Sequence, residues 1–174
     1  MQIPLIKVVQ MYEFHTFIQS KYNSLQKLNF PPFKFDVKRD GDQLQILDKL
    51  RKKWIVLTPE EWVRQHTIAF LVMQRNYPAG LIGVEKTVKI NGMIKRFDVV
   101  CYDQDAKPIL LVECKAPEVE ITQKVLDQAL RYNSQLQVNY LLLTNGIRHV
   151  IGYIDYENKK LDYLQDIPKF EDVK

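Results

Sequence analysis

The chain has 174 residues, 46% of them hydrophobic, which is enough for one domain with a buried core. Its 25 basic and 21 acidic residues give a net charge of +4, which permits a nucleic-acid partner without requiring one. The two cysteines lie in apolar stretches, which excludes a disulfide scaffold, and no segment is an apolar run of membrane-spanning length or a secretion signal. We therefore expect one cytoplasmic domain over residues 1–174, with no membrane partner.

Residues 1–57 are predicted to form a strand-rich N-terminal extension. Short apolar patches and aromatic residues between 30 and 35 precede Asp40-Gly41, a typical turn sequence. From residue 44 to residue 57, apolar and basic residues broadly alternate, as on a half-exposed sheet. The extension is therefore expected to contain strands rather than helices.

A helix is predicted to begin after Thr58 and to end near Asn76. Thr58 can cap this helix, Pro59 suits its first position, and acidic residues follow at the positive end of the helix dipole. The sequence Tyr77-Pro78-Ala79-Gly80 then breaks the helical pattern.

The remainder of the core is predicted to contain three antiparallel strands, a second helix and a final hairpin. Asn91-Gly92 and Asn145-Gly146 are typical hairpin turns, and Thr122 is a candidate helix cap. The resulting αβββαβ order indicates an α/β protein with a mixed sheet over residues 58–155, followed by a C-terminal tail over residues 156–174. The expected strands are 84–90, 93–102, 109–115, 138–144 and 147–156, and the expected second helix is 122–137.

The most informative chemistry lies on Asp98 in one predicted strand and on Glu113-Cys114-Lys115 at the end of the next. Alternate strand residues share a face, so Glu113 and Lys115 should project together. If paired residue numbers sum to 211, Asp98 lies opposite Glu113 on the same face. Two such carboxylates repel unless a cation lies between them, and Mg²⁺ or Mn²⁺ suits oxygen ligands. Lys115 would then orient the attacking water and neutralise charge developing on a phosphodiester.

An exposed salt bridge is the alternative interpretation, because the pattern acid-any-Lys is common in this chain. Only the copy at Glu113 ends an apolar strand that faces a cross-strand acid. Repulsion between the two acids would raise the pKa of one of them, so Asp98→Asn is expected to leave the metal-free fold equally or more stable. The pattern begins at Asp36, Asp105, Glu113, Glu157 and Asp172.

Several segments between residues 58 and 146 resemble, in the same order, the PD-(D/E)XK nuclease superfamily, and within it the N-terminal nuclease domain of type I restriction enzyme R subunits. The resemblance implies a restriction-endonuclease-like fold, with Asp98 and Glu113 as metal ligands and Lys115 as the catalytic lysine. The segments that carry it are TPEEWVRQ, VEKTVKINGMIKRFDVV, LLVECKAP, DQALRYN and LLTNG.

The resemblance also implies a helical acid and supporting polar residues. Glu61 and Glu60 are both candidates for the acid. Glu61 is preferred because, at helical spacing, it shares a face with Gln65 and Ile68 and so points toward the sheet. The alternative is an acid that serves only the helix dipole. Gln128 and Tyr132 match a Q-x-x-x-Y element and would support the site or contact the DNA backbone; alternatively, they are a solvated residue and a core aromatic. Arg96 is a candidate phosphate contact or part of a solvated strand face.

The predicted function is Mg²⁺- or Mn²⁺-dependent endonucleolytic cleavage of DNA in a restriction or DNA-processing context. The chain has no G-x-x-x-x-G-K-[ST] motif, so ATP-driven movement along DNA would require a separate motor subunit, and sequence recognition a separate specificity subunit. The alternative is a non-catalytic DNA-binding or complex-assembly module that keeps the nuclease fold.

Overall fold

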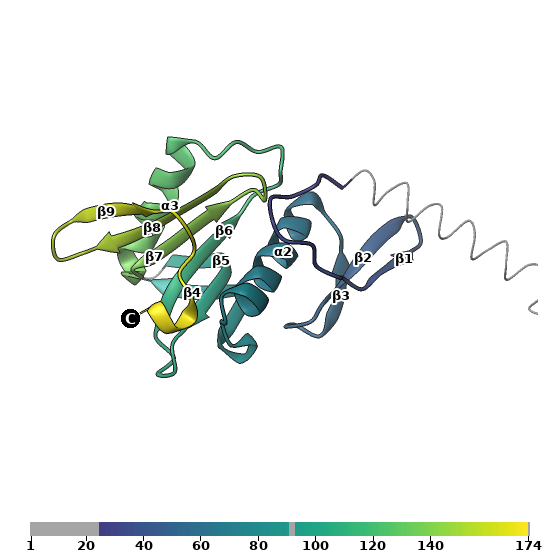
Figure 1. Cartoon of the computed structure of the whole chain (residues 1–174), viewed down its shortest axis with the longest axis horizontal. Helices are drawn as coiled ribbons and strands as arrows, with labels where there is room; N and C mark the ends of the chain where they lie inside the picture. The colour runs from purple at the N-terminus through teal and green to yellow at the C-terminus, as the bar shows by residue number, and fades with distance from the viewer. Residues whose placement is uncertain (1–24, 91–92, 174) are drawn as a thin grey trace, which may run out of the picture.

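The computed structural model describes residues 25–90 and 93–173 and shows a mixed α/β fold. A six-stranded sheet has helix α2 on one face and helix α3 on the other, and a three-stranded sheet lies on the far side of α2 (Figure 1). The predicted αβββαβ order is confirmed by α2, β4, β5, β6, α3 and β7. Residues 1–24 and the predicted Asn91-Gly92 turn lie outside the described residues. None of the helices in the described part is long and apolar enough to cross a membrane.

The three-stranded sheet confirms the strand-rich extension over its described part, residues 25–57. Its strands pair antiparallel in the order β1 (Val37–Asp40), β2 (Gln43–Asp48) and β3 (Lys53–Val56). The predicted turn joins β1 to β2, and Gly41 adopts a φ of +56°, which glycine tolerates without strain. Alternation along β2 buries Leu44, Ile46 and Asp48 on one face, so an acid shares the inner face of the extension with apolar residues.

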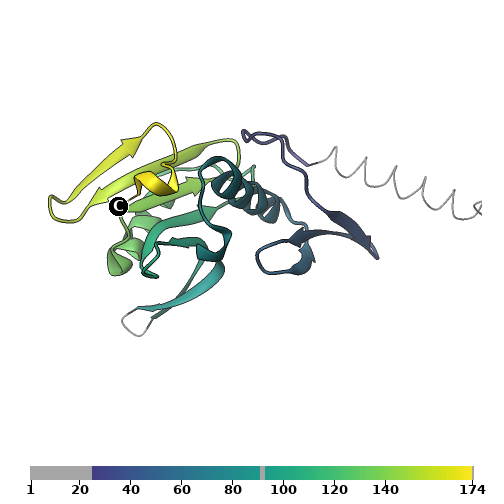
Figure 2. The same cartoon turned by 60° about the horizontal axis from the view of Figure 1, so that its bottom comes forward.

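Helix α2 (Pro59–Gln74) begins as its sequence predicts. The Thr58 side chain accepts a hydrogen bond from the Glu61 N–H at 3.1 Å, and Pro59 occupies the first turn. Figure 2 shows the helix between the two sheets, and this position explains why polar as well as apolar residues of α2 are buried. On the side facing the extension, the rings of Trp62 and His66 pack against Phe35.

The six strands of the large sheet are arranged in sequence order from β4 to β9, and all neighbours are antiparallel except β6 and β7. Helix α3 (Gln123–Leu136) connects this parallel pair. Residues 156–174, expected to be a tail, contribute β9, which pairs with β8, and a short 3-10 helix. The bounds are β4 (Ile82–Ile90), β5 (Met93–Tyr102), β6 (Pro108–Cys114), β7 (Tyr140–Thr144), β8 (His149–Asp155), β9 (Lys160–Leu164), η1 (Ala79–Leu81) and η2 (Phe170–Asp172).

The regular alternation of side chains along strand β5 is interrupted at Asp98. Val99 belongs to the apolar cluster on the α2 side, whereas Phe97 belongs to the cluster on the α3 side. Regular alternation would place these two side chains on the same face. Asp98 lies where the neighbouring strand has Glu85 in a left-handed conformation, with a φ of +50°. The interruption turns the Asp98 carboxylate toward α2.

Candidate active site

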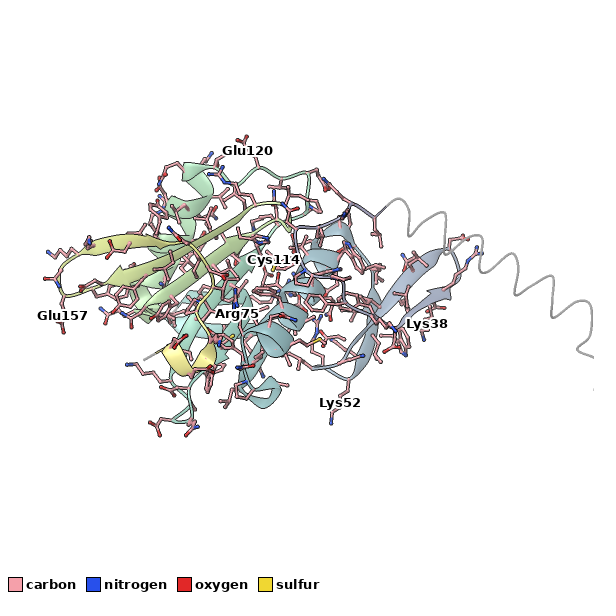
Figure 3. All side chains as sticks on the ribbon, in the orientation of Figure 1. Lys38, Lys52, Arg75, Cys114, Glu120 and Glu157 are labelled. Atoms are coloured by element: carbon pink, nitrogen blue, oxygen red, sulfur yellow. The ribbon has the colours of Figure 1, made fainter. Side chains whose placement is uncertain are left out.

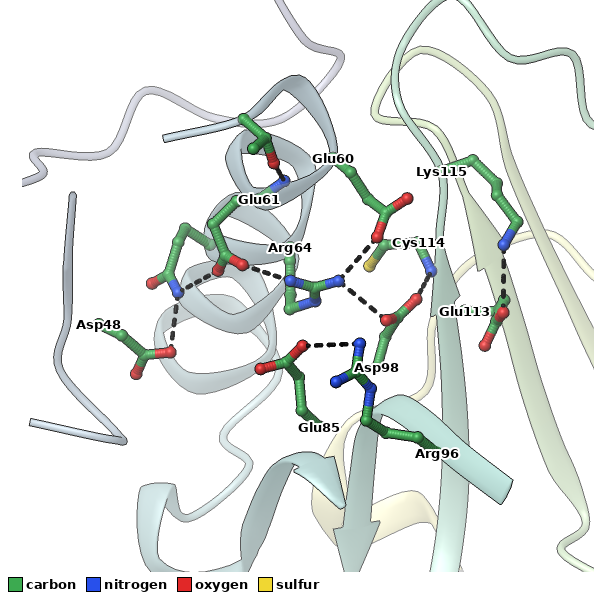
Figure 4. A network of polar contacts seen from close by, with 12 residues as sticks. Asp48, Glu60, Glu61, Arg64, Glu85, Arg96, Asp98, Glu113, Cys114 and Lys115 are labelled. Carbon is green, nitrogen blue, oxygen red and sulfur yellow. Dashed lines mark hydrogen bonds and ion pairs between the residues drawn. The ribbon is translucent and has the colours of Figure 1, made fainter. Parts of the chain in front are cut away.

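The β5–β6 register agrees with the sequence prediction, but the side of the sheet to which Asp98 points does not. Val99 pairs with Val112 and Val100 with Leu111, so paired residue numbers sum to 211; the register shifts only at Tyr102, which pairs with Pro108 rather than with residue 109. Asp98 Oδ2 accepts the Cys114 N–H at 2.7 Å. Figure 4 shows the Asp98 carboxylate directed toward Arg64 and Glu113 directed toward Lys115. The two acids therefore do not share one regular sheet face.

Arg64 is the central residue that the sequence prediction missed. Its guanidinium donates at 2.9 Å to both Glu60 and Asp98, and it also donates to Glu61. The Arg64 side chain is 5% exposed. Burial opposes its charge, but Asp98 and then Glu61 outweigh burial and raise its pKa, so Arg64 stays cationic. A detectable signal was an arginine on the helical face that also carries Ile68 and Leu71.

Both candidate helical acids contact Arg64, but in different environments. Glu61 is 8% exposed, and its carboxylate also accepts from Gln65 at 2.9 Å and from Arg51 at 3.2 Å. Glu60 is 45% exposed and has only Arg64 as a donor among the described residues. Glu61 thus holds two arginines in place, whereas Glu60 retains free acceptor capacity.

The extension completes the cluster of charges through Asp48 and Arg51. Arg51 donates to Asp48 at 2.5 Å and also pairs with Glu85. Asp48 is fully buried and accepts from Gln65 at 3.0 Å as well. Arg96, a predicted phosphate contact, pairs with Glu85 at 3.3 Å and keeps most of its side chain in solvent. The extension therefore contributes directly to the polar site.

Glu113 and Lys115 form the second half of the site. Lys115 Nζ lies 3.2 Å from Glu113 Oε1, and both side chains are partly exposed. Burial, reinforced by Asp98, raises the pKa of Glu113. Burial lowers the pKa of Lys115, but Glu113 outweighs this effect and the net pKa is raised. Lys115 is therefore a cation at neutral pH, suited to stabilising negative charge rather than to accepting a proton.

Gln128 and Tyr132, the predicted Q-x-x-x-Y pair, lie near Glu113 and Lys115. Both line a small pocket between β6 and α3, together with Glu113 and Lys115. Gln128 Nε2 donates to Tyr132 Oη at 3.0 Å. The pair shares a pocket with the second half of the site, and the hydrogen bond between its members fixes their relative orientation.

The cluster of charges around Arg64, which is the first half of the site, has an excess of acidic groups that would attract a divalent cation. Asp48, Glu60, Glu61, Glu85 and Asp98 contribute five carboxylates, against the three guanidinium groups of Arg51, Arg64 and Arg96, so two negative charges remain uncompensated. Among the described residues, no three His, Cys, Asp or Glu side chains converge as a ready-made metal cage. Mg²⁺ does not require one, because it binds through one or two carboxylates and keeps several waters or substrate oxygens.

Comparisons with known proteins agree with this fold. A family model described as type I restriction enzyme R protein N terminus (HSDR_N) matches residues 59–168, more than half of the chain. A fragment structure assigned to an HsdR subunit of a type I restriction enzyme from Vibrio vulnificus YJ016 is 22% identical, with a TM-score of 0.50. That alignment covers 67% of this chain and only 24% of the other. No curated protein is similar enough to count as a relative. The chain thus belongs to the family of N-terminal domains of type I restriction enzyme R proteins.

Proposed function

We propose that this domain hydrolyses DNA phosphodiester bonds in a Mg²⁺-dependent reaction. The observation that carries the proposal is the hydrogen bond from the Cys114 N–H to Asp98, which holds this acid beside the strand end that bears Glu113 and Lys115, in a family of restriction-enzyme domains. Mg²⁺ or Mn²⁺ held by Asp98 and Glu113 would supply Lewis-acid activation of the phosphodiester and of water.

The protein's own groups would act by orientation and by charge. Arg64 and the Cys114 N–H hold the Asp98 carboxylate, and each of its oxygens keeps a lone pair for a further ligand. Lys115 would donate to the attacking water and neutralise the developing charge. Glu61 would act as a positioning residue, because three of the four acceptor lone pairs of its carboxylate are taken by Arg64, Arg51 and Gln65.

Supercoiled plasmid, incubated with purified protein and Mg²⁺ or Mn²⁺, tests the proposal. The wild type should nick the plasmid, and Lys115→Ala should not. Lys107→Ala is the matched control, since Asp105-Ala106-Lys107 repeats the acid-any-Lys pattern on the turn of the same hairpin. Equal nicking by wild type and Lys115→Ala, or loss of nicking in Lys107→Ala as well, would reject the assigned role of Lys115.

A non-catalytic DNA-binding or assembly module is the second candidate. Arg64 favours it, because this buried cation already compensates Asp98 without any metal. Such a module would bind DNA but show neither nicking nor Mn²⁺ binding. Under either function, DNA translocation and sequence recognition would come from protein outside these 174 residues, which contain no G-x-x-x-x-G-K-[ST] motif.

A further inference from the structure

The positive charge of the chain is concentrated in the extension. Residues 25–57 contain eight basic and four acidic residues, an excess of four, which equals the net charge of +4 of the whole chain. Residues 58–174, which include the candidate nuclease core, contain fifteen basic and sixteen acidic residues. Most non-specific affinity for DNA comes from cations that neutralise phosphates. A core with a small negative charge and an acidic site lacks this attraction.

Intramolecular ion pairs leave Lys38, Lys52 and Lys53 of the extension available. Each of its four acids is engaged: Asp36 by Lys49, Asp40 by Gln45, Asp42 by Arg39 and Asp48 by Arg51. Lys38, Lys52 and Lys53 have no carboxylate partner within residues 25–90 and 93–173. The excess charge is therefore carried by side chains that do not pair within the described fold.

One of these lysines, Lys38, lies beside an exposed aromatic ring, and the other two directly precede that ring residue in the chain. Trp54 on the edge strand β3 is 37% exposed, Val56 on the same face is 44% exposed, and Lys38 Nζ lies 4.6 Å from the centroid of the Trp54 ring. Lys52 and Lys53 immediately precede Trp54 and are exposed. We name Lys38, Lys52, Lys53 and Trp54 the Trp54 patch. Figure 3 shows Lys38 and Lys52 on the three-stranded sheet, across α2 from the six-stranded sheet.

The Trp54 patch is connected to the candidate active site through the turn between β2 and β3. Arg51, the residue before Lys52, pairs with Glu61 and Glu85 of the charge cluster. One residue of extended chain spans at most about 3.6 Å, so the patch begins within a few ångströms of the backbone that bears Arg51. The family model begins only at residue 59, so the patch is outside the part of the chain that defines the family.

We infer that the Trp54 patch is a DNA-binding surface, on which lysines neutralise backbone phosphates and the Trp54 ring stacks on a base or sugar. The inference rests on the proposed function, which takes DNA as the substrate. Charge complementarity favours DNA over a protein partner, because the apolar area is limited to Trp54 and Val56 and is bordered by unpaired lysines. The extension supplies the electrostatic attraction, and the core supplies the chemistry.

Fluorescence anisotropy with a labelled duplex of about 25 base pairs tests this surface, since a site of this length can contact several phosphates. All proteins carry Lys115→Ala, and EDTA is present, so binding is measured without cleavage. The test variant combines Lys38→Gln, Lys52→Gln and Lys53→Gln. The matched control combines Lys107→Gln, Lys124→Gln and Lys159→Gln, which removes the same charge from exposed positions of the core. Both triples include one lysine with positive φ, Lys52 or Lys159, and thermal melts verify folding.

The test variant should bind roughly 100-fold more weakly at 0.1 M salt, and the slope of log affinity against log salt should fall by about 2.7, or 0.9 for each lost phosphate contact. The control triple should change both quantities much less. Trp54→Ala should weaken binding several-fold with an unchanged slope, because stacking releases no counterions. Equal loss in both triples, or no loss in either, overturns the inference; the second result indicates a protein-docking face. Because binding is measured without metal, a failure of the proposed nuclease activity leaves this test intact.

Discussion

Replacing Arg64 with methionine should destabilise the metal-free protein more than any other single charge change in the cluster. Methionine fills similar space but donates no hydrogen bond. The substitution removes the cation that contacts Glu60, Glu61 and Asp98, of which Glu61 and Asp98 are largely buried. A buried carboxylate that loses its cationic partner carries a desolvation cost that its remaining hydrogen bonds offset only in part.

The structure sets the expected magnitude near the lower end of the range for breaking a buried ion pair, about 3 kcal/mol. Asp98 keeps the Cys114 N–H, Glu61 keeps Arg51 and Gln65, and Glu60 reaches solvent. For a chain of this length, such a loss lowers Tm by about 6–12 °C.

Urea denaturation followed by circular dichroism in EDTA measures this loss directly. Arg39→Met is the control: Arg39 forms an exposed pair with Asp42, and this variant should lose less than about 1 kcal/mol. Adding Asp98→Asn to Arg64→Met should recover part of the loss, by about 1–2 kcal/mol relative to additivity, because the unpaired charge disappears. A loss below about 0.5 kcal/mol in Arg64→Met, or strict additivity in the double variant, would refute the central position of Arg64.

Three further outcomes follow from the site and its surroundings. Asp98→Asn should cost about 1–3 kcal/mol of stability without metal, the reverse of the expectation from sequence, because Arg64 loses a hydrogen-bond partner. Glu113→Gln should be neutral or stabilising at pH 7, because the raised pKa of Glu113 means that its charged form destabilises the fold, and this gain should vanish below the usual pKa of 4.5. Thermal melts across pH verify both. Burial lowers the pKa of His66 below 6.5, so the folded state disfavours protonated His66 and the free energy of unfolding should fall as pH drops below about 6.5. In pH-dependent melts, His66→Phe should reduce this dependence of stability on pH. Tyr132→Phe should change stability by less than about 1 kcal/mol but slow plasmid nicking about tenfold, and equal nicking rates would exclude a role for its hydroxyl.

Local sequence signals predicted most of the fold. Thr58 and Pro59 start α2 by contacts within one turn, and Gly146 adopts a φ of +80°, as its position in a turn requires. Leu28 and Val63 pack against Gly146 so closely that a Cβ atom there would clash with Leu28, which is a long-range constraint no local pattern reveals. Strand β9 was also missed, because it is defined by its backbone hydrogen bonds to the edge of β8 rather than by a local sequence preference.

The candidate site was predicted where chemistry is local and missed where contacts are distant. Glu113 and Lys115 lie two residues apart and meet as strand periodicity requires. The partners of Asp98 depend on the left-handed conformation of Glu85 in the neighbouring strand, which turns Asp98 toward α2. Arg64 and Asp48 had a weaker signal, charged residues on otherwise apolar faces, which indicates burial but not the partner.

Calorimetric titration of Mn²⁺ into the metal-free protein near neutral pH tests most directly whether Asp98 and Glu113 hold a divalent cation. The wild type should show a saturable site, and both Asp98→Asn and Glu113→Gln should lose it while Lys107→Ala retains it. Absence of binding to the wild type, or equal binding by wild type and both acid variants, would contradict the metal-dependent mechanism and leave a DNA-binding module with a nuclease fold.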